Sequence, residues 1–191
     1  MEKRKRKMTL VALNASRDGF QVDLKYASCD NITGQKIYKN ATPYLHKDAF
    51  NAFLDAHKLA QAMGLNIKIF DAFRPTAAQE ILWSYFPDPN FVAPPAIGSP
   101  HTRGIAIDLT LIDQSGKELD MGTYFDDFTD ASYHKSMAVS AEAQKNRILL
   151  CGLMRLAGWN HNTIEWWHYQ LPEHKTYPLI NDELVCREIM T

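Results

Sequence analysis

The run His101-Thr-Arg-Gly-Ile-Ala-Ile-Asp108 places an imidazole ahead of an apolar segment and a carboxylate inside that segment. Asp108 stands between Ile107 and Leu109, where an unpaired charge would be costly. It must therefore have a cation, an arginine or several backbone donors as its partner. Gly104 permits a tight bend between the two groups. Taken alone, the pair fits a salt-bridged aspartate near a surface histidine as well as it fits a metal site.

A second acid and a second imidazole occur together in the run Glu165-Trp-Trp-His168. Two histidines and one carboxylate can hold zinc with a fourth position open for water. If His101, Asp108 and His168 are the ligands, Glu165 is left to accept a proton from that water. His168 alone would fit a core histidine, and the two tryptophans would fit simple packing. The occurrence of all these groups in one short chain favours a catalytic metal site.

The spacing of Glu165 and His168 constrains the backbone between them. Residues three apart in a regular strand face opposite sides of the sheet, so a strand could not turn both side chains toward one metal. We therefore expect Glu165 to lie in the loop before the strand, or the segment to contain a bulge or a helical turn.

Arg74 follows a predicted strand and precedes a predicted helix in the run Asp71-Ala-Phe-Arg74-Pro75. An arginine at such a strand end can stabilise negative charge that develops on a substrate oxygen. A surface ion pair between Arg74 and Asp71 is the alternative interpretation of this spacing.

The hydrophobic pattern predicts an α+β fold, with helices packed on a mainly antiparallel sheet. One predicted helix has Thr76 and Gln79 spaced as a capping box, and the five prolines between residues 87 and 100 predict a long loop. The predicted strands and helices are, in order, a strand at 20–27, a helix at 48–63, a strand at 66–70, a helix after Pro75, a strand at 105–112, a helix at 140–157 and a strand at 164–170.

Composition limits the classes of function. The chain has 191 residues and a net charge of −1, but five basic residues lie within the first seven positions, and the remainder carries 16 basic against 21 acidic residues. This acidic body argues against nucleic-acid binding, and no apolar run approaches the length of a membrane span. Three widely spaced cysteines do not suggest disulfides or a cysteine metal site. We predict a basic tail at 1–15, one domain at 16–191 and a cytoplasmic protein; the sequence predicts no oligomeric state.

Taken together, these motifs resemble those of the D-alanyl-D-alanine dipeptidases of the VanX type. These enzymes belong with the D-Ala-D-Ala carboxypeptidases and the Hedgehog-type zinc fold. The similarity covers roughly residues 20–180. It includes the two runs with the histidines and four further runs: Leu24-Lys-Tyr-Ala27, Asp30-Asn-Ile-Thr-Gly34, Asp71-Ala-Phe-Arg-Pro75 and Asp120-Met-Gly-Thr-Tyr-Phe-Asp126.

The resemblance implies a role for each matching residue. It implies one zinc per chain on His101, Asp108 and His168, with Glu165 first as general base and then as proton donor to the leaving amine. Arg74 would polarise the scissile carbonyl. Three further residues would bind the small dipeptide substrate: Asp126 at its ammonium group, with Tyr26 nearby, and Ser99 as an anchor. The implied reaction is hydrolysis of D-Ala-D-Ala to two D-alanines.

Three other functions fit parts of the pattern. A carboxypeptidase or endopeptidase of the same fold would act on peptidoglycan stems outside the cytoplasm. A non-haem iron oxygenase also uses two histidines and one carboxylate, but it does not need Glu165. A catalytically silent zinc-binding module would need neither Glu165 nor Arg74. The presence of both residues favours hydrolysis.

Overall fold

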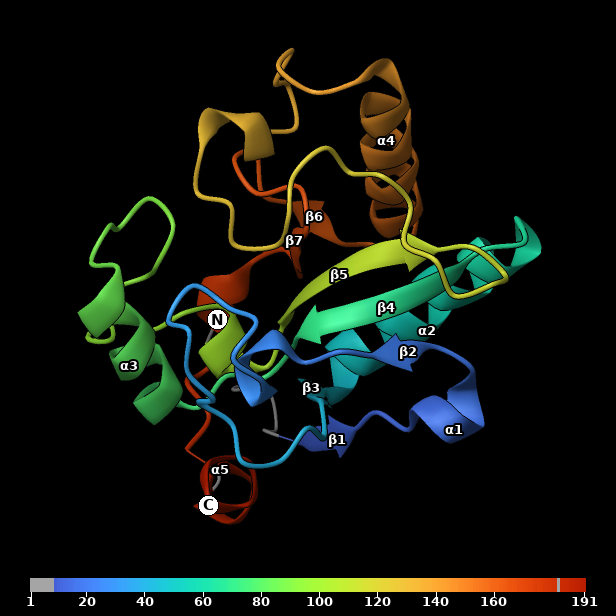
Figure 1. Cartoon of the computed structure of the whole chain (residues 1–191). Coiled ribbons are helices and arrows are strands. Elements are labelled where there is room, and N and C mark those ends of the chain that lie inside the picture. The colour runs from blue at the N-terminus through green and yellow to red at the C-terminus, as the bar shows by residue number, and fades with distance from the viewer. Residues whose placement is uncertain (1–8, 182) are drawn as a thin grey trace, which may run out of the picture.

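A five-stranded sheet in the order β2-β4-β5-β7-β6 forms the centre of the fold. The structure is a computed structural model that describes residues 9–181 and 183–191 (Figure 1). The strands of this sheet are β2 (Gln21–Val22), β4 (Asn66–Asp71), β5 (Ala106–Ile112), β6 (Asn160–His161) and β7 (His168–Gln170). All neighbouring strands are antiparallel except β2 and β4. The predicted α+β class with a mainly antiparallel sheet is therefore confirmed.

A second sheet pairs β1 (Leu10–Ala12) with β3 (Tyr44–His46). Strand β1 lies within the N-terminal tail predicted at residues 1–15. Backbone pairing with the buried strand β3 instead incorporates Leu10–Ala12 into the fold. We therefore propose that the domain extends back to residue 10 at least, while residues 1–8 lie outside the described part of the chain.

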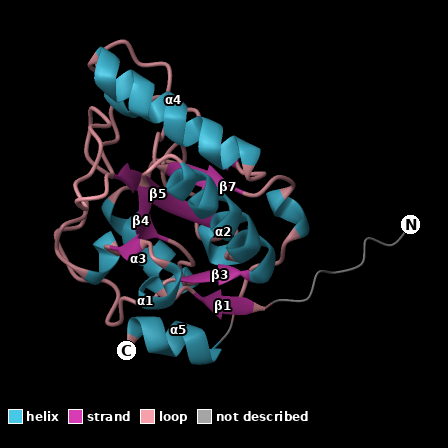
Figure 2. Ribbon diagram, turned by 90° about the vertical axis from the view of Figure 1, so that its right-hand side faces the viewer, coloured by secondary structure: helices cyan, strands magenta, loops and turns pink. Residues whose placement is uncertain are grey.

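Two long amphipathic helices pack against each other and against the central strands. They are α2 (Lys47–Ala62) and α4 (Ala141–Leu156), which lie within two residues of the predicted bounds. Helix α2 lies behind β4 in Figure 1 and buries Phe53, Ala56 and Ala60. Figure 2 shows α4 at one end of the molecule and the short helix α5 (Glu183–Met190) at the other, with the strands between them. The two remaining helices are α1 (Ala15–Asp18) and α3 (Thr76–Tyr85).

Two predicted strands are much shorter than the sequence pattern suggests. The alternating segment at 20–27 pairs with β4 only at Gln21–Val22 and then turns into a 3₁₀ helix at Lys25–Ala27, which buries Tyr26. The segment at 164–170 becomes a strand only at His168, because Glu165–His168 form a turn closed by the bond from His168 N–H to the Glu165 carbonyl. Glu165 thus lies in the loop before the strand, which is the first of the two arrangements expected from the sequence.

The capping box predicted at Thr76 and Gln79 is wrong. Pro75 occupies the N-cap position of α3, and no side chain caps this helix. The Gln79 side chain points elsewhere: its Oε1 accepts a hydrogen bond from Arg74 Nη1 at 3.0 Å, and its Nε2 donates to the Ala93 carbonyl at 2.8 Å. For the Gln79 side chain, hydrogen bonds to a charged donor and to the proline-rich loop at 87–100 are therefore more favourable than a capping bond at the start of α3.

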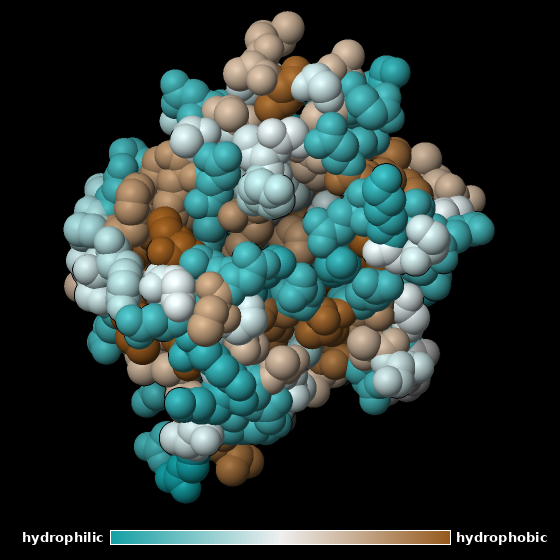
Figure 3. All heavy atoms as spheres, viewed as in Figure 1, coloured by the Kyte–Doolittle hydropathy of each residue, from teal (hydrophilic) through white to brown (hydrophobic). Residues whose placement is uncertain are grey.

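Most of the face drawn in Figure 3 is hydrophilic, with apolar atoms visible in patches between polar side chains. Among the described residues, no helix is both long and apolar enough to cross a membrane.

One buried arginine attaches the long segment between β5 and α4 to the body of the fold. Arg147 on α4 is 0% exposed. It donates hydrogen bonds to three carbonyl oxygens of that segment, at Met121, Ala131 and Tyr133, over distances of 2.7–2.9 Å. A neutral apolar side chain would leave one buried and two partly buried carbonyls without their donors, which is costly.

Arg147→Met should therefore lower the free energy of unfolding by about 2–5 kcal/mol. Lys145→Met on the same helix is the matched control, because Lys145 is exposed and its pair with Glu142 is 3.5 Å long. Urea denaturation followed by circular dichroism would measure both variants. Equal stabilities for the two would show that Arg147 does not hold the segment.

Candidate metal and active site

Three ligand candidates come together from separate parts of the chain. His101 begins a 3₁₀ helix at His101–Arg103, Asp108 lies in β5 and His168 begins β7. The antiparallel register places Asp108 directly opposite His168. His101 Nε2 lies 3.1 Å from His168 Nδ1 and 3.3 Å from Asp108 Oδ2, and His168 Nδ1 lies 3.0 Å from Asp108 Oδ1. All three side chains are buried.

Neighbouring acceptors fix which ring nitrogen of each histidine faces the cluster. His101 Nδ1 lies 2.7 Å from the Ala72 carbonyl, so its proton belongs there. His168 Nε2 lies 3.3 Å from Gln170 Oε1, to which it can donate. In the neutral form that binds a metal, the rings would present the lone pairs of His101 Nε2 and His168 Nδ1 to the point that they share with the Asp108 carboxylate. Such outer partners commonly orient the histidines of metal sites.

This cluster fits a single divalent metal ion. The three facing atoms lie close together in space, which is the arrangement of metal ligands. Ligands at about 2.0–2.1 Å from a tetrahedral centre are roughly 3.3 Å from one another, close to the 3.0–3.3 Å found between Asp108 and the two rings. Two lone pairs and a carboxylate that face one buried point repel each other unless a cation lies between them.

Asp108 is held in its charged form. Burial by itself would raise the pKa of the Asp108 carboxyl, but the charges and hydrogen bonds that His101 and His168 supply when protonated outweigh burial and bring that pKa below its usual range. A carboxylate that remains ionised is the form that binds a metal.

Glu165 lies beside the cluster without being one of its three members. Its Oε2 is 4.0 Å from His168 Nδ1 and accepts a hydrogen bond from Asn162 Nδ2 at 2.6 Å. Burial raises the pKa of the Glu165 carboxyl to about 8. A carboxyl group with a pKa near neutrality can accept and return a proton, which suits an acid–base role.

Arg74 forms an ion pair with Asp71 and also faces the cluster. Its Nε and Nη2 bond to Asp71 Oδ2 at 2.9 and 2.8 Å, so the ion pair is present, although it is buried and not on the surface. The same guanidinium lies 3.7 Å from Asp108 Oδ2 and 5.0 Å above the ring of Tyr26. Its neighbouring carboxylates keep the pKa of Arg74 well above the usual value despite burial. A permanent, oriented positive charge therefore faces the cluster.

Asp126 lies at another side of the site and has an unusual backbone conformation. Its φ of 59° is in the left-handed region, which non-glycine residues rarely adopt. The Tyr26 hydroxyl donates to its carboxylate, at 3.0 Å to Oδ2. Burial raises the pKa of the Asp126 carboxyl to about 7. A carboxyl group in a pocket with a pKa shifted this far is typical of a functional position.

One cavity of about 150 Å³ is lined by every site residue that the sequence analysis named. We call it the inner pocket. Those residues are Tyr26, Arg74, Ser99, His101, Asp108, Asp126, Glu165 and His168. Ser99 is buried, and its hydroxyl accepts the His101 N–H at 3.1 Å. Residues of the proline-rich loop, including Phe91 and Val92, form another part of the wall.

Three polar residues of the site were missed in the sequence analysis. Asn162 orients Glu165, Gln170 accepts from His168, and Gln79 holds Arg74. Gln170 could have been predicted, because it lies two residues after His168 on the same strand and therefore on the same face of the sheet. Asn162 and Gln79 act through loop and helix geometry that spacing alone does not reveal.

Two imidazoles and a carboxylate around one point, with a second carboxylate in the same pocket, define the class of metal-dependent hydrolases. A family model described as D-ala-D-ala dipeptidase matches residues 6–188, and the chain belongs to this peptidase family.

Curated relatives extend over nearly the whole chain. A D-alanyl-D-alanine dipeptidase of Escherichia coli is 44% identical over 177 residues, which cover 93% of this chain and 92% of the relative. A protein of the same name from Enterococcus faecium is 30% identical and covers 84% of this chain and 89% of the relative. A third protein of this name, from Streptomyces coelicolor, is 31% identical and covers 81% of this chain and 87% of the relative.

Removal of one imidazole should empty the metal site. His168→Ala is expected to lose most of its bound metal, because two ligands on one side cannot enclose the ion. His57→Ala is the control: His57 is also buried, but its Nε2 contacts the Asp18 carbonyl on α1. Metal content per chain after gel filtration measures both. Full metal retention at normal affinity in His168→Ala would contradict the assignment.

Proposed function

We propose that the protein is a zinc-dependent dipeptidase that hydrolyses D-Ala-D-Ala to two D-alanines. The observation that carries the proposal is the inner pocket, which holds a three-ligand metal site, a separate carboxyl group beside it and a fixed guanidinium. The donor set of two nitrogens and one oxygen suits zinc, and the names of the relatives support the substrate.

Glu165 has the position of a general base in this proposal. When bound, the zinc would polarise the scissile carbonyl and lower the pKa of a water molecule toward neutrality. Glu165 takes a proton from the attacking water and returns it to the leaving amine. Its raised pKa fits this double role, and the bond from Asn162 holds the carboxylate in place between the two proton transfers.

Arg74 stabilises the negative charge that develops on the carbonyl oxygen. Three of its donor atoms are already engaged by Asp71 and Gln79, so the guanidinium needs no reorientation when the substrate arrives. Donors that are fixed in advance stabilise charge in the transition state more effectively than mobile ones.

The size and charge of the pocket favour a free dipeptide. Asp126 binds the substrate ammonium, with the Tyr26 hydroxyl holding its carboxylate, and Ser99 contributes a hydroxyl at the pocket wall. A volume of about 150 Å³ is small for a peptide chain. A cytoplasmic location stays a prediction, which cell fractionation would test.

The direct test is hydrolysis of three peptides by the purified protein: D-Ala-D-Ala, L-Ala-L-Ala and a stem pentapeptide that ends in D-Ala-D-Ala. D-Ala-D-Ala should be cleaved fastest. Activity should be lost on chelation and should return with added zinc. Preferential cleavage of the pentapeptide would instead indicate a carboxypeptidase.

Glu165→Gln should separate catalysis from metal binding. The variant keeps the size of the side chain but loses the base, so kcat should fall about 10²–10⁴-fold while the zinc content stays at one per chain. Glu173→Gln is the control, because Glu173 lies in the exposed turn after β7. Parallel loss of zinc and activity in Glu165→Gln would show that Glu165 is a ligand.

Acetylation of the substrate amine should greatly reduce cleavage. An acylated amine leaves the half-buried Asp126 carboxylate without its ionic partner, at a cost of about 1–3 kcal/mol or more, equivalent to roughly tenfold to more than a hundredfold in kcat/KM. Asp126→Asn should reduce the difference in kcat/KM between the two peptides, because it should impair cleavage of the free dipeptide more than that of N-acetyl-D-Ala-D-Ala. Equal rates for both peptides in the wild type would mean that the pocket is open at this end.

A further inference from the structure

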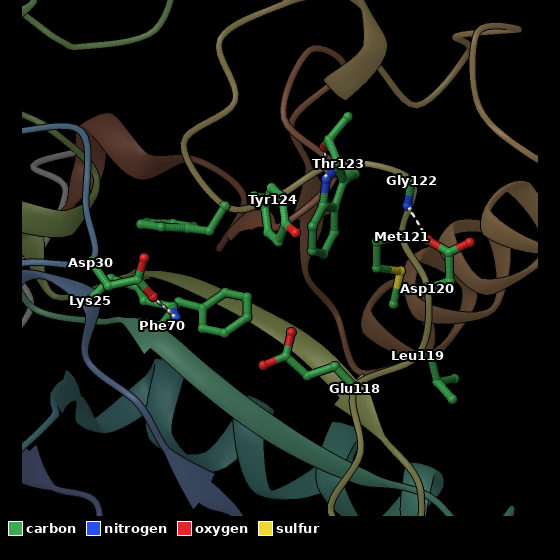
Figure 4. A pocket seen from close by; sticks show the side chains of 12 residues that line it. Lys25, Asp30, Phe70, Glu118, Leu119, Asp120, Met121, Gly122, Thr123 and Tyr124 are labelled. Atoms are coloured by element: carbon green, nitrogen blue, oxygen red, sulfur yellow. Dashed lines mark hydrogen bonds and ion pairs between the residues drawn. The ribbon is translucent and has the colours of Figure 1, made fainter.

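A second, larger cavity lies next to the inner pocket, and none of the roles assigned above uses it. We call it the outer pocket. Its volume is about 430 Å³, and it lies over Phe70 at the end of β4. Figure 4 shows the Glu118 carboxylate on one side of the Phe70 ring and the paired Lys25 and Asp30 side chains on the other. Tyr124 points toward this space from the loop opposite.

Phe125 lies between the two pockets. It lines the outer pocket, where its ring centroid is 5.4 Å from that of Phe70. On the other side it contacts two residues that line the inner pocket: Tyr26 at 5.9 Å and Trp167 at 5.5 Å between ring centroids. Phe125, Tyr26 and Trp167 thus form an aromatic wall.

Consecutive residues line opposite sides of this wall at two places. Phe125 lines the outer pocket and Asp126 the inner one; likewise Trp166 lines the outer pocket and Trp167 the inner one. At these two places the backbone divides the pockets, and elsewhere the Phe125 ring on the outer side packs against the Tyr26 and Trp167 rings on the inner side. The wall adjoins Asp126, which is the residue that binds the substrate ammonium in the proposed function.

The charges of the outer pocket differ from those of a general apolar cleft. Its lining includes one lysine and three carboxylates, at Asp30, Glu118 and Asp120. Lys25 is paired with Asp23 and Asp30, while Glu118 is paired with Lys68. The negative excess favours a ligand group that carries a positive charge above an apolar floor.

We propose that Phe125 determines the length of the substrate, and that the outer pocket can hold one further residue at the amino end of the peptide once this ring is removed. The proposal rests on the proposed function, because it uses the position of the substrate ammonium at Asp126. With Phe125 in place, a peptide extended at that end meets the aromatic wall. Without Phe125, the extension has a path toward Phe70 and Glu118, while the scissile bond between the two D-alanines keeps its position.

The test compares a dipeptide with tripeptides on wild type and Phe125→Ala. The substrates are D-Ala-D-Ala, L-Lys-D-Ala-D-Ala and L-Glu-D-Ala-D-Ala, and release of the terminal D-alanine is measured. Phe125→Ala should raise the ratio of kcat/KM for the lysine tripeptide to kcat/KM for the dipeptide by at least about tenfold, the scale of discrimination by a hydrophobic pocket wall. The increase in relative kcat/KM should be larger for the lysine tripeptide than for the glutamate tripeptide, because the outer pocket is acidic.

Phe50→Ala is the matched control, since Phe50 is also half-buried but lies on α2 and lines neither pocket. It should leave the ratio unchanged. Phe125→Leu, which retains most of the apolar volume, replaces Phe125→Ala if circular dichroism or metal content shows that the alanine variant is damaged. It should give a smaller shift in the same direction.

Two results would overturn the proposal: an unchanged ratio in a folded, metal-containing Phe125 variant, or equal gains for the lysine and glutamate tripeptides. Both are distinct from failure of the proposed function, which would appear as a wild-type protein that does not cleave D-Ala-D-Ala. A wild type that cleaves the dipeptide, with a ratio insensitive to Phe125, would refute only the role of the wall.

Discussion

Two aspartates face each other across the central strands, and the site is built around the need to balance their charges. The register of β4 and β5 pairs Asp71 with Asp108, and both side chains are buried. Like charges directly opposite in a sheet are destabilising, and buried charges need partners. On one side, the positive charge of Arg74 contacts both carboxylates. On the other side, Asp108 contacts the two imidazoles and can share a cation with them, which would balance its charge.

This balance also explains why Arg74 is so firmly held. The Tyr38 hydroxyl donates to the second oxygen of Asp71, so this carboxylate is bonded on both sides and cannot rotate away from the guanidinium. Gln79 then connects Arg74 to the proline-rich loop through Ala93. The ion pair, the guanidinium that faces the cluster and one wall of the pocket therefore belong to a single hydrogen-bonded unit. A change in any member of the unit affects the others.

The membership of the site was more predictable from sequence than its geometry. His101, Asp108, Glu165 and His168 could be grouped from sequence because their types and neighbours restrict the possible explanations, and the structure places all four around one pocket. The orientation of Glu165 could only be stated as alternatives, since the turn before β7 depends on tertiary hydrogen bonds such as that from Trp166 N–H to the Ser132 carbonyl.

Local rules failed where tertiary contacts compete with them. Gln79 matched a helix cap, yet a buried guanidinium and a loop carbonyl offer stronger partners than the first turn of α3. The alternation at 20–27 matched a strand, but only two residues pair with β4 before the chain turns inward at Tyr26. In the same way, the pairing of β1 with β3 joins segments far apart in the chain, and no local pattern at 10–12 predicts it.

The left-handed backbone at Asp126 limits which amino acids this position can hold, independently of charge. Glycine, asparagine and aspartate enter this conformation readily, whereas longer side chains do so at a cost of roughly 1 kcal/mol or more. Glutamate carries the same charge and can adopt this backbone at that cost, as Glu173 does with a φ of 53°, but it would extend its carboxylate further from Cα than the bond to Tyr26 requires. Of the two acidic amino acids, aspartate therefore suits the main chain and the pocket better, and this position accepts fewer amino acids than its charge alone would allow.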